Sequence, residues 1–138
     1  MTSTLRVALA GAGAFGVKHL EAMQNIAGIE VVSIVGRELD KTREVAQRFR
    51  IGHVTTNLDE TLARKDVDAV ILATPTQLHA QQALACLRAG KHVQVEIPLC
   101  DRLADGEAVV ELQRKAGLVA MCGTSASLSG SAINRSKK

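Results

Sequence analysis

Aromatic residues are scarce in this chain of 138 residues, which has no Trp, no Tyr and only two Phe, Phe15 and Phe49. Proteins that bind single-stranded nucleic acid stack the bases on aromatic rings, and they bind the backbone with clustered basic side chains. Here the net charge is only +3, and Lys and Arg are scattered among acidic residues. The composition therefore argues against a nucleic-acid partner.

Cysteine is scarce as well. The three cysteines, Cys86, Cys100 and Cys122, are odd in number and form no C-x-x-C pair. That pattern argues against a disulfide framework and against a zinc site, and it is typical of a reducing compartment. The N-terminus has no apolar signal-peptide core, and no apolar run is long enough to span a membrane. We expect a cytoplasmic protein with no membrane partner and no bound metal.

The N-terminal stretch predicts a dinucleotide-binding turn. Residues 5–10 form a short, mostly apolar run that predicts a buried strand, and residues 15–26 carry apolar side chains at helical spacing. Between them lies G-x-G-x-x-G, whose glycines allow a tight turn, close approach of a pyrophosphate and close helix packing. A strand–helix turn without a ligand is the alternative. The predicted cofactor-binding residues are Gly11, Gly13, Ala14, Phe15 and Gly16.

Strands and helices alternate along the rest of the chain, which predicts a doubly wound parallel sheet, the Rossmann dinucleotide-binding fold. We expect one domain over residues 1–122 and a flexible serine-rich tail over residues 123–138. Two helix starts have capping residues, one at Asn57 and one at Thr74. Further strands are predicted at 29–35, 53–55, 68–73, 92–95 and 118–122, and further helices at 39–49, 57–65, 74–90 and 101–116.

The end of the second predicted strand bears on which nucleotide is bound. An NAD-specific domain carries a carboxylate there for the ribose 2′-hydroxyl. This chain has Gly36 and then Arg37, whose guanidinium can bind a 2′-phosphate, and Gly36 leaves room for it. We predict NADP as cofactor with both residues in contact. NAD stays possible, because Arg37 could be a solvated loop residue and Glu38 could reach the ribose.

Two further motifs complete a family resemblance. Residues 73–80 read ATPTQLHA and residues 89–98 read AGKHVQVEIP. Together with the glycine turn they resemble the cofactor domain of the glucose–fructose oxidoreductase / inositol 2-dehydrogenase (Gfo/Idh/MocA) family, over about residues 5–122. The resemblance implies an NAD(P)-dependent dehydrogenase. It implies cofactor contacts from Thr74, Pro75, Thr76, His79, Glu96, Ile97 and Pro98, although His79 could equally be a surface residue and Glu96 a solvated acid.

One departure from the family concerns chemistry. Ile97 stands where the family motif has a lysine, so we assign no catalytic residue in this chain. The motif is most similar to that of a branch that oxidises the cyclic hemiacetal of a carboxylated substrate in bacterial aromatic catabolism. A hemiacetal hydroxyl is more acidic than a sugar hydroxyl, which favours a site without the lysine.

A second departure concerns length. Family members continue into an α/β substrate domain, which also builds the oligomer, whereas serine-rich sequence follows Gly123 here. We expect a truncated product that lacks the substrate domain and is inactive alone. A non-catalytic NADP(H)-binding module or sensor is the alternative. A methyltransferase that binds S-adenosylmethionine shares the glycine turn, but Arg37 argues against it.

Overall fold

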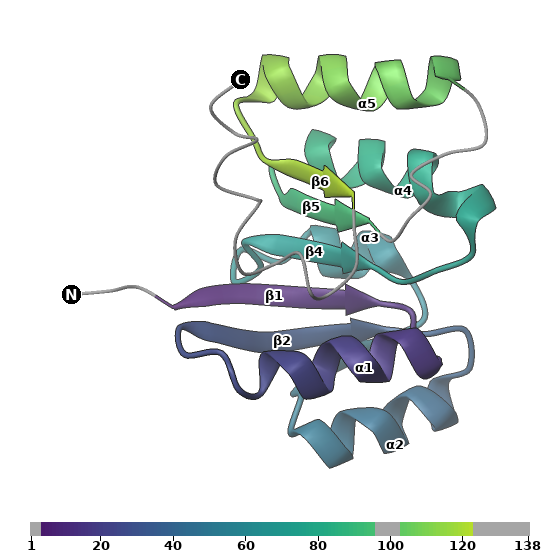
Figure 1. Ribbon diagram of the computed structural model, residues 1–138. Coiled ribbons are helices and arrows are strands. Elements are labelled where there is room, and N and C mark those ends of the chain that lie inside the picture. The colour runs from purple at the N-terminus through teal and green to yellow at the C-terminus, as the bar shows by residue number, and fades with distance from the viewer. Residues whose placement is uncertain (1–3, 96–102, 123–138) are drawn as a thin grey trace.

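The computed structural model describes residues 4–95 and 103–122, which form a six-stranded parallel sheet with strand order β3-β2-β1-β4-β5-β6 (Figure 1). This order, with a helix between consecutive strands, confirms the predicted doubly wound fold. The strands are β1 (Leu5–Ala10), β2 (Ile29–Val35), β3 (His53–Thr55), β4 (Ala69–Leu72), β5 (His92–Val95) and β6 (Ala120–Cys122). The helices are α1 (Ala14–Met23), α2 (Leu39–Phe49), α3 (Leu58–Leu62), α4 (Thr76–Arg88) and α5 (Leu103–Ala116).

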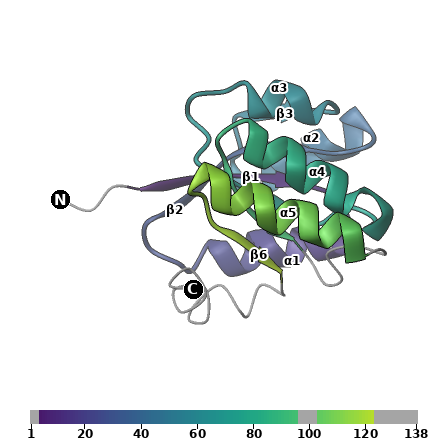
Figure 2. The ribbon, with the colours of Figure 1, turned by 90° about the horizontal axis from the view of Figure 1, so that it is seen from above.

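Both faces of the sheet carry an apolar core, and Figure 2 shows α1 on one side of the sheet with α3 and α4 on the other. Successive side chains of a strand point to opposite faces. Val7 and Leu9 of β1 accordingly pack with α1 and α2, while Ala8 and Ala10 pack with α3, α4 and α5. Burial on both faces explains why β1 is a nearly continuous apolar run rather than an alternating one.

The predicted element bounds differ from the structure mainly at the ends of elements. The bounds of β2, α2, β3 and β5 are as predicted, and β4, β6 and α3 are shorter. The first helix ends at Met23, because Asn25 and Ile26 donate to carbonyl groups three residues back and so form a tight final turn. In the part of the chain that is described, no helix is long and apolar enough to cross a membrane.

One of the two predicted helix caps is confirmed and the other is wrong. The side-chain oxygen of Asn57 accepts the backbone N–H of Asp59 at 3.0 Å and caps α3. Thr74 does not cap α4, whose N-cap residue is Pro75. Thr74 lies one residue too early, and its hydroxyl donates to Gln82 instead.

Candidate functional site

The carboxyl ends of β1 and β4 meet in the middle of the sheet. The chain leaves β1 toward β2 on one side and leaves β4 toward β5 on the other, so the two strands form a topological switch point. Helices α1 and α4 begin just beyond these strand ends. Doubly wound sheets bind their ligands in the crevice at such a point, and the predicted glycine turn lies in it.

Two glycines of this turn are required by backbone contacts. Gly11 has φ of 109°, and a Cβ on it would overlap the carbonyl oxygen of Ala73 in the turn after β4. A Cβ on Gly16 would overlap the carbonyl oxygen of Gly11. Hydrogen bonds of 2.7 Å, from Gly11 N–H to the Val35 carbonyl and from Ala73 N–H to the Ala10 carbonyl, fix the strand ends. The turn can therefore take this shape only with glycine at both positions.

Gly13 has a different reason to be glycine. Its φ of −79° suits any residue, and no atom of the described residues lies within 4 Å of the position that a Cβ would take. The fold therefore does not require glycine here. A side chain would stand in open space in front of the start of α1, where a pyrophosphate approaches the backbone in dinucleotide-binding folds. The shape of the turn thus fits a dinucleotide.

The two helices at the switch point begin differently from α2 and α3. Among the described residues, neither α1 nor α4 has a side-chain cap or an acidic residue in its first turn. By contrast, α2 has Asp40 in its first turn, and α3 has the Asn57 cap with Asp59 and Glu60. Uncapped N–H groups and the positive end of the helix dipole favour bound anions. The start of α1, beside the glycine turn, thus suits the pyrophosphate of a dinucleotide.

The turn between β4 and α4 contains the predicted residues Thr74, Pro75 and His79. Pro75 is exposed at its tip, and Thr74 is half-buried. His79 is only 2% exposed, so the alternative of a surface histidine is wrong. Its Nε2 lies 2.6 Å from the carbonyl oxygen of Thr74, and because a carbonyl only accepts, Nε2 is the donor. The imidazole thus holds the turn from inside the protein.

At the end of β2, the structure explains Gly36 by packing. A Cβ on Gly36 would overlap the hydroxyl of Thr42, which is buried and donates to the Glu38 carbonyl at 2.6 Å. Thr42 therefore fills the space next to Gly36 that was expected from the sequence to be open to a phosphate. Arg37 is exposed and forms no ion pair among the described residues. The Glu38 carboxylate lies 3.2 Å from Lys41 Nζ, which draws it toward α2.

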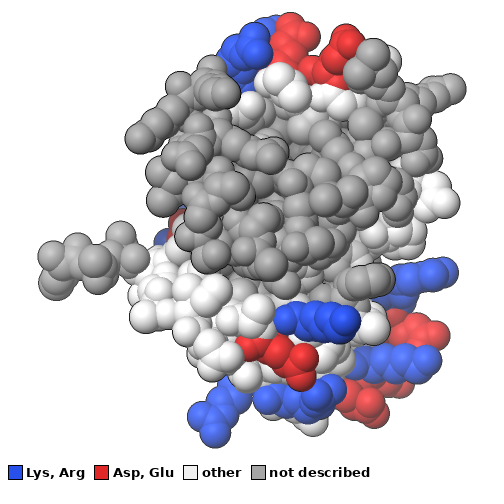
Figure 3. All heavy atoms as spheres, in the orientation of Figure 1, with Lys and Arg blue, Asp and Glu red and all other residues white. Residues whose placement is uncertain are grey.

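Charged side chains around α2 are of both signs. Figure 3 shows Lys and Arg intermixed with Asp and Glu at the lower edge of the molecule, where α2 lies in Figure 1. The helix itself carries Lys41, Arg43 and Arg48 beside Asp40 and Glu44. A guanidinium in such surroundings provides a local contact for a phosphate rather than part of an extended basic surface.

Among the described residues, Cys86 does not meet the requirements of a nucleophile, and no group of side chains meets those of a metal site. The thiol of Cys86 is buried in the core, and its burial raises its pKa to about 12. It therefore stays protonated and packs as an apolar group. Residues 4–95 and 103–122 contain no group of three His, Cys, Asp or Glu side chains placed to hold a metal ion.

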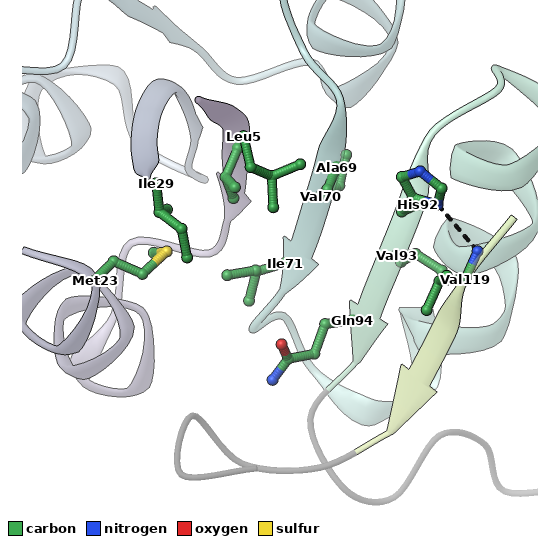
Figure 4. Close-up of a pocket in the computed structure, with 11 residues that line it drawn as sticks. Leu5, Met23, Ile29, Ala69, Val70, Ile71, His92, Val93, Gln94 and Val119 are labelled. Carbon is green, nitrogen blue, oxygen red and sulfur yellow. Dashed lines mark hydrogen bonds between the residues drawn. The ribbon is translucent and has the colours of Figure 1, made fainter. Parts of the chain in front are cut away.

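The structure has a cavity away from the switch point. A cavity of about 240 Å³ opens over β1, β4 and β5 and is lined almost wholly by apolar side chains (Figure 4). The ring of His92 is held at its edge, because its Nδ1 accepts the Val119 N–H at 3.0 Å. Ligand pockets usually measure about 300–1,000 Å³ and offer several polar groups. This cavity does not match a dinucleotide.

The structure thus gathers the predicted residues of the two turns at one edge of the sheet, with Gly36 and Arg37 at the end of the next strand. The side chains of Phe15 and Thr76, and all of Glu96, Ile97 and Pro98, lie outside the described residues. Gln82 and Thr42 also contribute to the two strand ends and were not among the predicted residues. Gln82 lies three residues after His79 on the same side of α4. This spacing is the only sequence feature that could have identified it.

Comparison with known proteins agrees with this geometry. Residues 5–124 match the family model described as "Oxidoreductase family, NAD-binding Rossmann fold" (GFO_IDH_MocA), and the chain belongs to this family. It is therefore a nicotinamide-dinucleotide-binding domain of an oxidoreductase family, as the resemblance implied.

Two relatives indicate the range of the family. The chain is 59% identical over 119 residues to 4-carboxy-2-hydroxymuconate-6-semialdehyde dehydrogenase of Sphingobium sp. (strain NBRC 103272 / SYK-6), with 86% of this chain and 38% of that protein covered. It is 36% identical over 114 residues to inositol 2-dehydrogenase of Rhodococcus erythropolis, with 82% and 33% covered. The chain thus spans about a third of the length of these relatives.

Solved structures of similar fold hold either nicotinamide cofactor. The 3-ketoreductase KijD10 of Actinomadura kijaniata, in complex with TDP-benzene and NADP, gives a TM-score of 0.82 at 32% identity, covering 87% of this chain and 38% of that one. GenD2 from gentamicin A biosynthesis, in complex with NAD, gives a TM-score of 0.85 at 32% identity, covering 89% and 35%. The likeness supports a dinucleotide at the switch point.

Proposed function

We propose that this domain serves a dehydrogenase that oxidises the cyclic hemiacetal of 4-carboxy-2-hydroxymuconate-6-semialdehyde to 2-pyrone-4,6-dicarboxylate in aromatic catabolism. The observation that carries the proposal is the 59% identity to the Sphingobium enzyme of that name, against 36% to an inositol 2-dehydrogenase. Ile97, in place of the family's lysine, supports the same branch. Substrate contacts belong to the rest of such an enzyme.

The chain's own residues would orient the cofactor. The glycine turn and the start of α1 receive the pyrophosphate, while Thr74 and Pro75 flank the nicotinamide ribose. Oxidation of the hemiacetal removes a hydride from its carbon and a proton from its hydroxyl, and leaves a lactone carbonyl. The bound cofactor supplies the hydride acceptor. Ile97 has no titratable group, so the proton must leave through another residue or through water.

We further propose NADP as the preferred cofactor. Arg37 follows the end of β2, where the adenosine ribose of such a fold is held, and its exposed guanidinium is free to bind a 2′-phosphate. The pairing of Glu38 with Lys41 reduces its availability to a 2′-hydroxyl. NAD binding would continue at lower affinity, because the pyrophosphate contacts are the same for both cofactors.

Two assays test these proposals. NADPH and NADH are titrated separately into the purified chain, and reduction of NADP is then followed with the semialdehyde as substrate. Saturable binding that is tighter for NADPH supports the cofactor proposal, and NADH preference contradicts it. Hydride transfer specific to the semialdehyde supports the dehydrogenase proposal. Cofactor binding without hydride transfer by a longer protein that contains this domain together with a substrate domain would favour a non-catalytic NADP(H) module.

A further inference from the structure

We propose that His79 and Gln82 are positioning residues that fix the β4–α4 turn against the glycine turn and so set the shape of the cofactor site. The inference rests on the proposed cofactor function and extends it to two side chains that lie behind the turn. Both residues are on α4, three positions apart, and both bond to Thr74.

The first of these contacts holds the Thr74 backbone. The backbone hydrogen bond from Ala73 N–H to the Ala10 carbonyl is the last one between the chain segments of β4 and β1. The carbonyl of Thr74 therefore lies beyond the end of the sheet. His79 Nε2 donates to it at 2.6 Å from a buried position. Without that donor, the carbonyl would lose its protein partner, and the turn would be free to seek water.

The second contact orients the Thr74 side chain. Its hydroxyl donates to the side-chain oxygen of Gln82 at 2.5 Å. The hydroxyl proton is thereby used for this bond, and the two lone pairs of the oxygen can accept hydrogen bonds from a ligand. Thr74 is therefore prepared to receive a donor such as a ribose hydroxyl.

The turn after β4 also contacts the glycine turn, where the pyrophosphate is expected, through its backbone. A Cβ on Gly11 would overlap the Ala73 carbonyl oxygen and would lie 3.3 Å from the Thr74 nitrogen. The peptide between Ala73 and Thr74 therefore forms one wall of the glycine turn. A shift of Thr74 would move that wall, so the two α4 side chains act on both halves of the site.

The experiment distinguishes an effect of His79 and Gln82 on the cofactor site from an effect on the stability of the whole fold. His79→Leu and Gln82→Leu remove the polar contacts, whereas His79→Gln keeps a donor and Gln82→Glu keeps an acceptor. Lys91→Met is the matched control, because the buried Lys91 Nζ donates to the Arg64 and Val67 carbonyls at 2.7 Å, beyond the opposite ends of the strands. NADPH affinity and Tm are measured for each variant.

We expect His79→Leu to weaken NADPH binding about 10-fold at a temperature where it is fully folded, as the loss of one buried hydrogen bond would. His79→Gln should recover most of the affinity, and the two Gln82 variants should follow the same order. Lys91→Met should lower Tm with the NADPH Kd unchanged. If His79→Leu also lowers only Tm, the positioning role is overturned.

A ligand-free readout keeps this test independent of the proposed function. Backbone hydrogen exchange is measured at the Gly11 and Ala73 amides, whose N–H groups donate to Val35 and Ala10. His79→Leu should speed exchange at both amides by about 10-fold or more relative to wild type, whereas Lys91→Met should not. Failure of the wild type to bind NADPH would count against the proposed function alone. Unchanged exchange in His79→Leu would count against the positioning role alone.

Discussion

The carbonyl oxygen of Ala73 occupies the space into which a side chain at Gly11 would extend. The turn after β1 and the turn after β4 are thus in direct backbone contact at the switch point of the sheet. One turn offers the uncapped start of α1 to phosphates, and the other brings Thr74 and Pro75 to the same edge. The site is built from two turns that cannot move separately.

This contact predicts that Gly11→Ala destabilises the fold itself. The added methyl meets backbone rather than a flexible side chain, and φ of 109° is unfavourable for alanine. We expect the free energy of unfolding to fall by at least about 2 kcal/mol. Urea unfolding followed by circular dichroism measures the loss. A midpoint equal to that of the wild type would show that the two turns are not in contact.

Arg37→Gln tests the choice of nucleotide. Removal of the guanidinium should weaken NADPH binding by about 10-fold or more, the value of a charge-assisted contact to phosphate, and should leave NADH binding nearly unchanged. Arg88→Gln is the control, because Arg88 is an exposed arginine in the last turn of α4, far along the chain from β2. Equal losses for both cofactors would mean that Arg37 does not read the 2′-phosphate.

Asp68 predicts how stability depends on pH. Its carboxylate accepts the Arg6 backbone N–H at 2.9 Å, and this bond, together with the Arg6 side chain, lowers the pKa of Asp68 below its ordinary value of 3.8. A lowered folded-state pKa gives stability that is present above pH 3.8 and is lost as the pH falls through the folded-state value. Arg64 lowers the pKa of Asp66 in the same sense.

Asp68→Asn should therefore reduce stability at pH 7 and make it less sensitive to acid below about pH 4. The measurement is the free energy of unfolding of wild type and variant between pH 7 and pH 3. Asp59→Asn is the control, because Asp59 is an exposed carboxylate whose backbone N–H, not its side chain, bonds to the Asn57 cap. If the free energy of unfolding of wild type and Asp68→Asn depends on pH in the same way, the lowered pKa of Asp68 is contradicted.

The sequence was sufficient to predict those features that depend on local pattern. The buried run of β1, the glycine turn after it and the bounds Leu39–Phe49 of α2 follow from hydrophobic periodicity and from the conformational freedom of glycine. The Asn57 cap was predictable for the same reason, since a cap bonds within three residues.

Features that depend on tertiary contacts were not predictable. The capping role expected of Thr74 fails because its partners are His79 and Gln82, a choice made by the path of the chain from β4 into α4. Gly36 was expected to leave room for a ligand, but the first turns of α2 bring Thr42 against it. Local pattern identifies the residues at such positions, whereas only the folded chain reveals what they touch.

Gly13 provides the most direct test of the dinucleotide site. None of the described residues comes within 4 Å of its Cβ position, and its backbone suits any residue, so Gly13→Ala should leave Tm and the unfolding midpoint unchanged. The new methyl would stand where the pyrophosphate approaches, and we expect NADPH affinity to fall by at least about 10-fold, or about 1.4 kcal/mol. The measurement is an NADPH titration of wild type and Gly13→Ala side by side. Saturable binding by the wild type with a clear loss in a fully folded Gly13→Ala is the expected result, and equal binding by both would contradict a cofactor site at this turn.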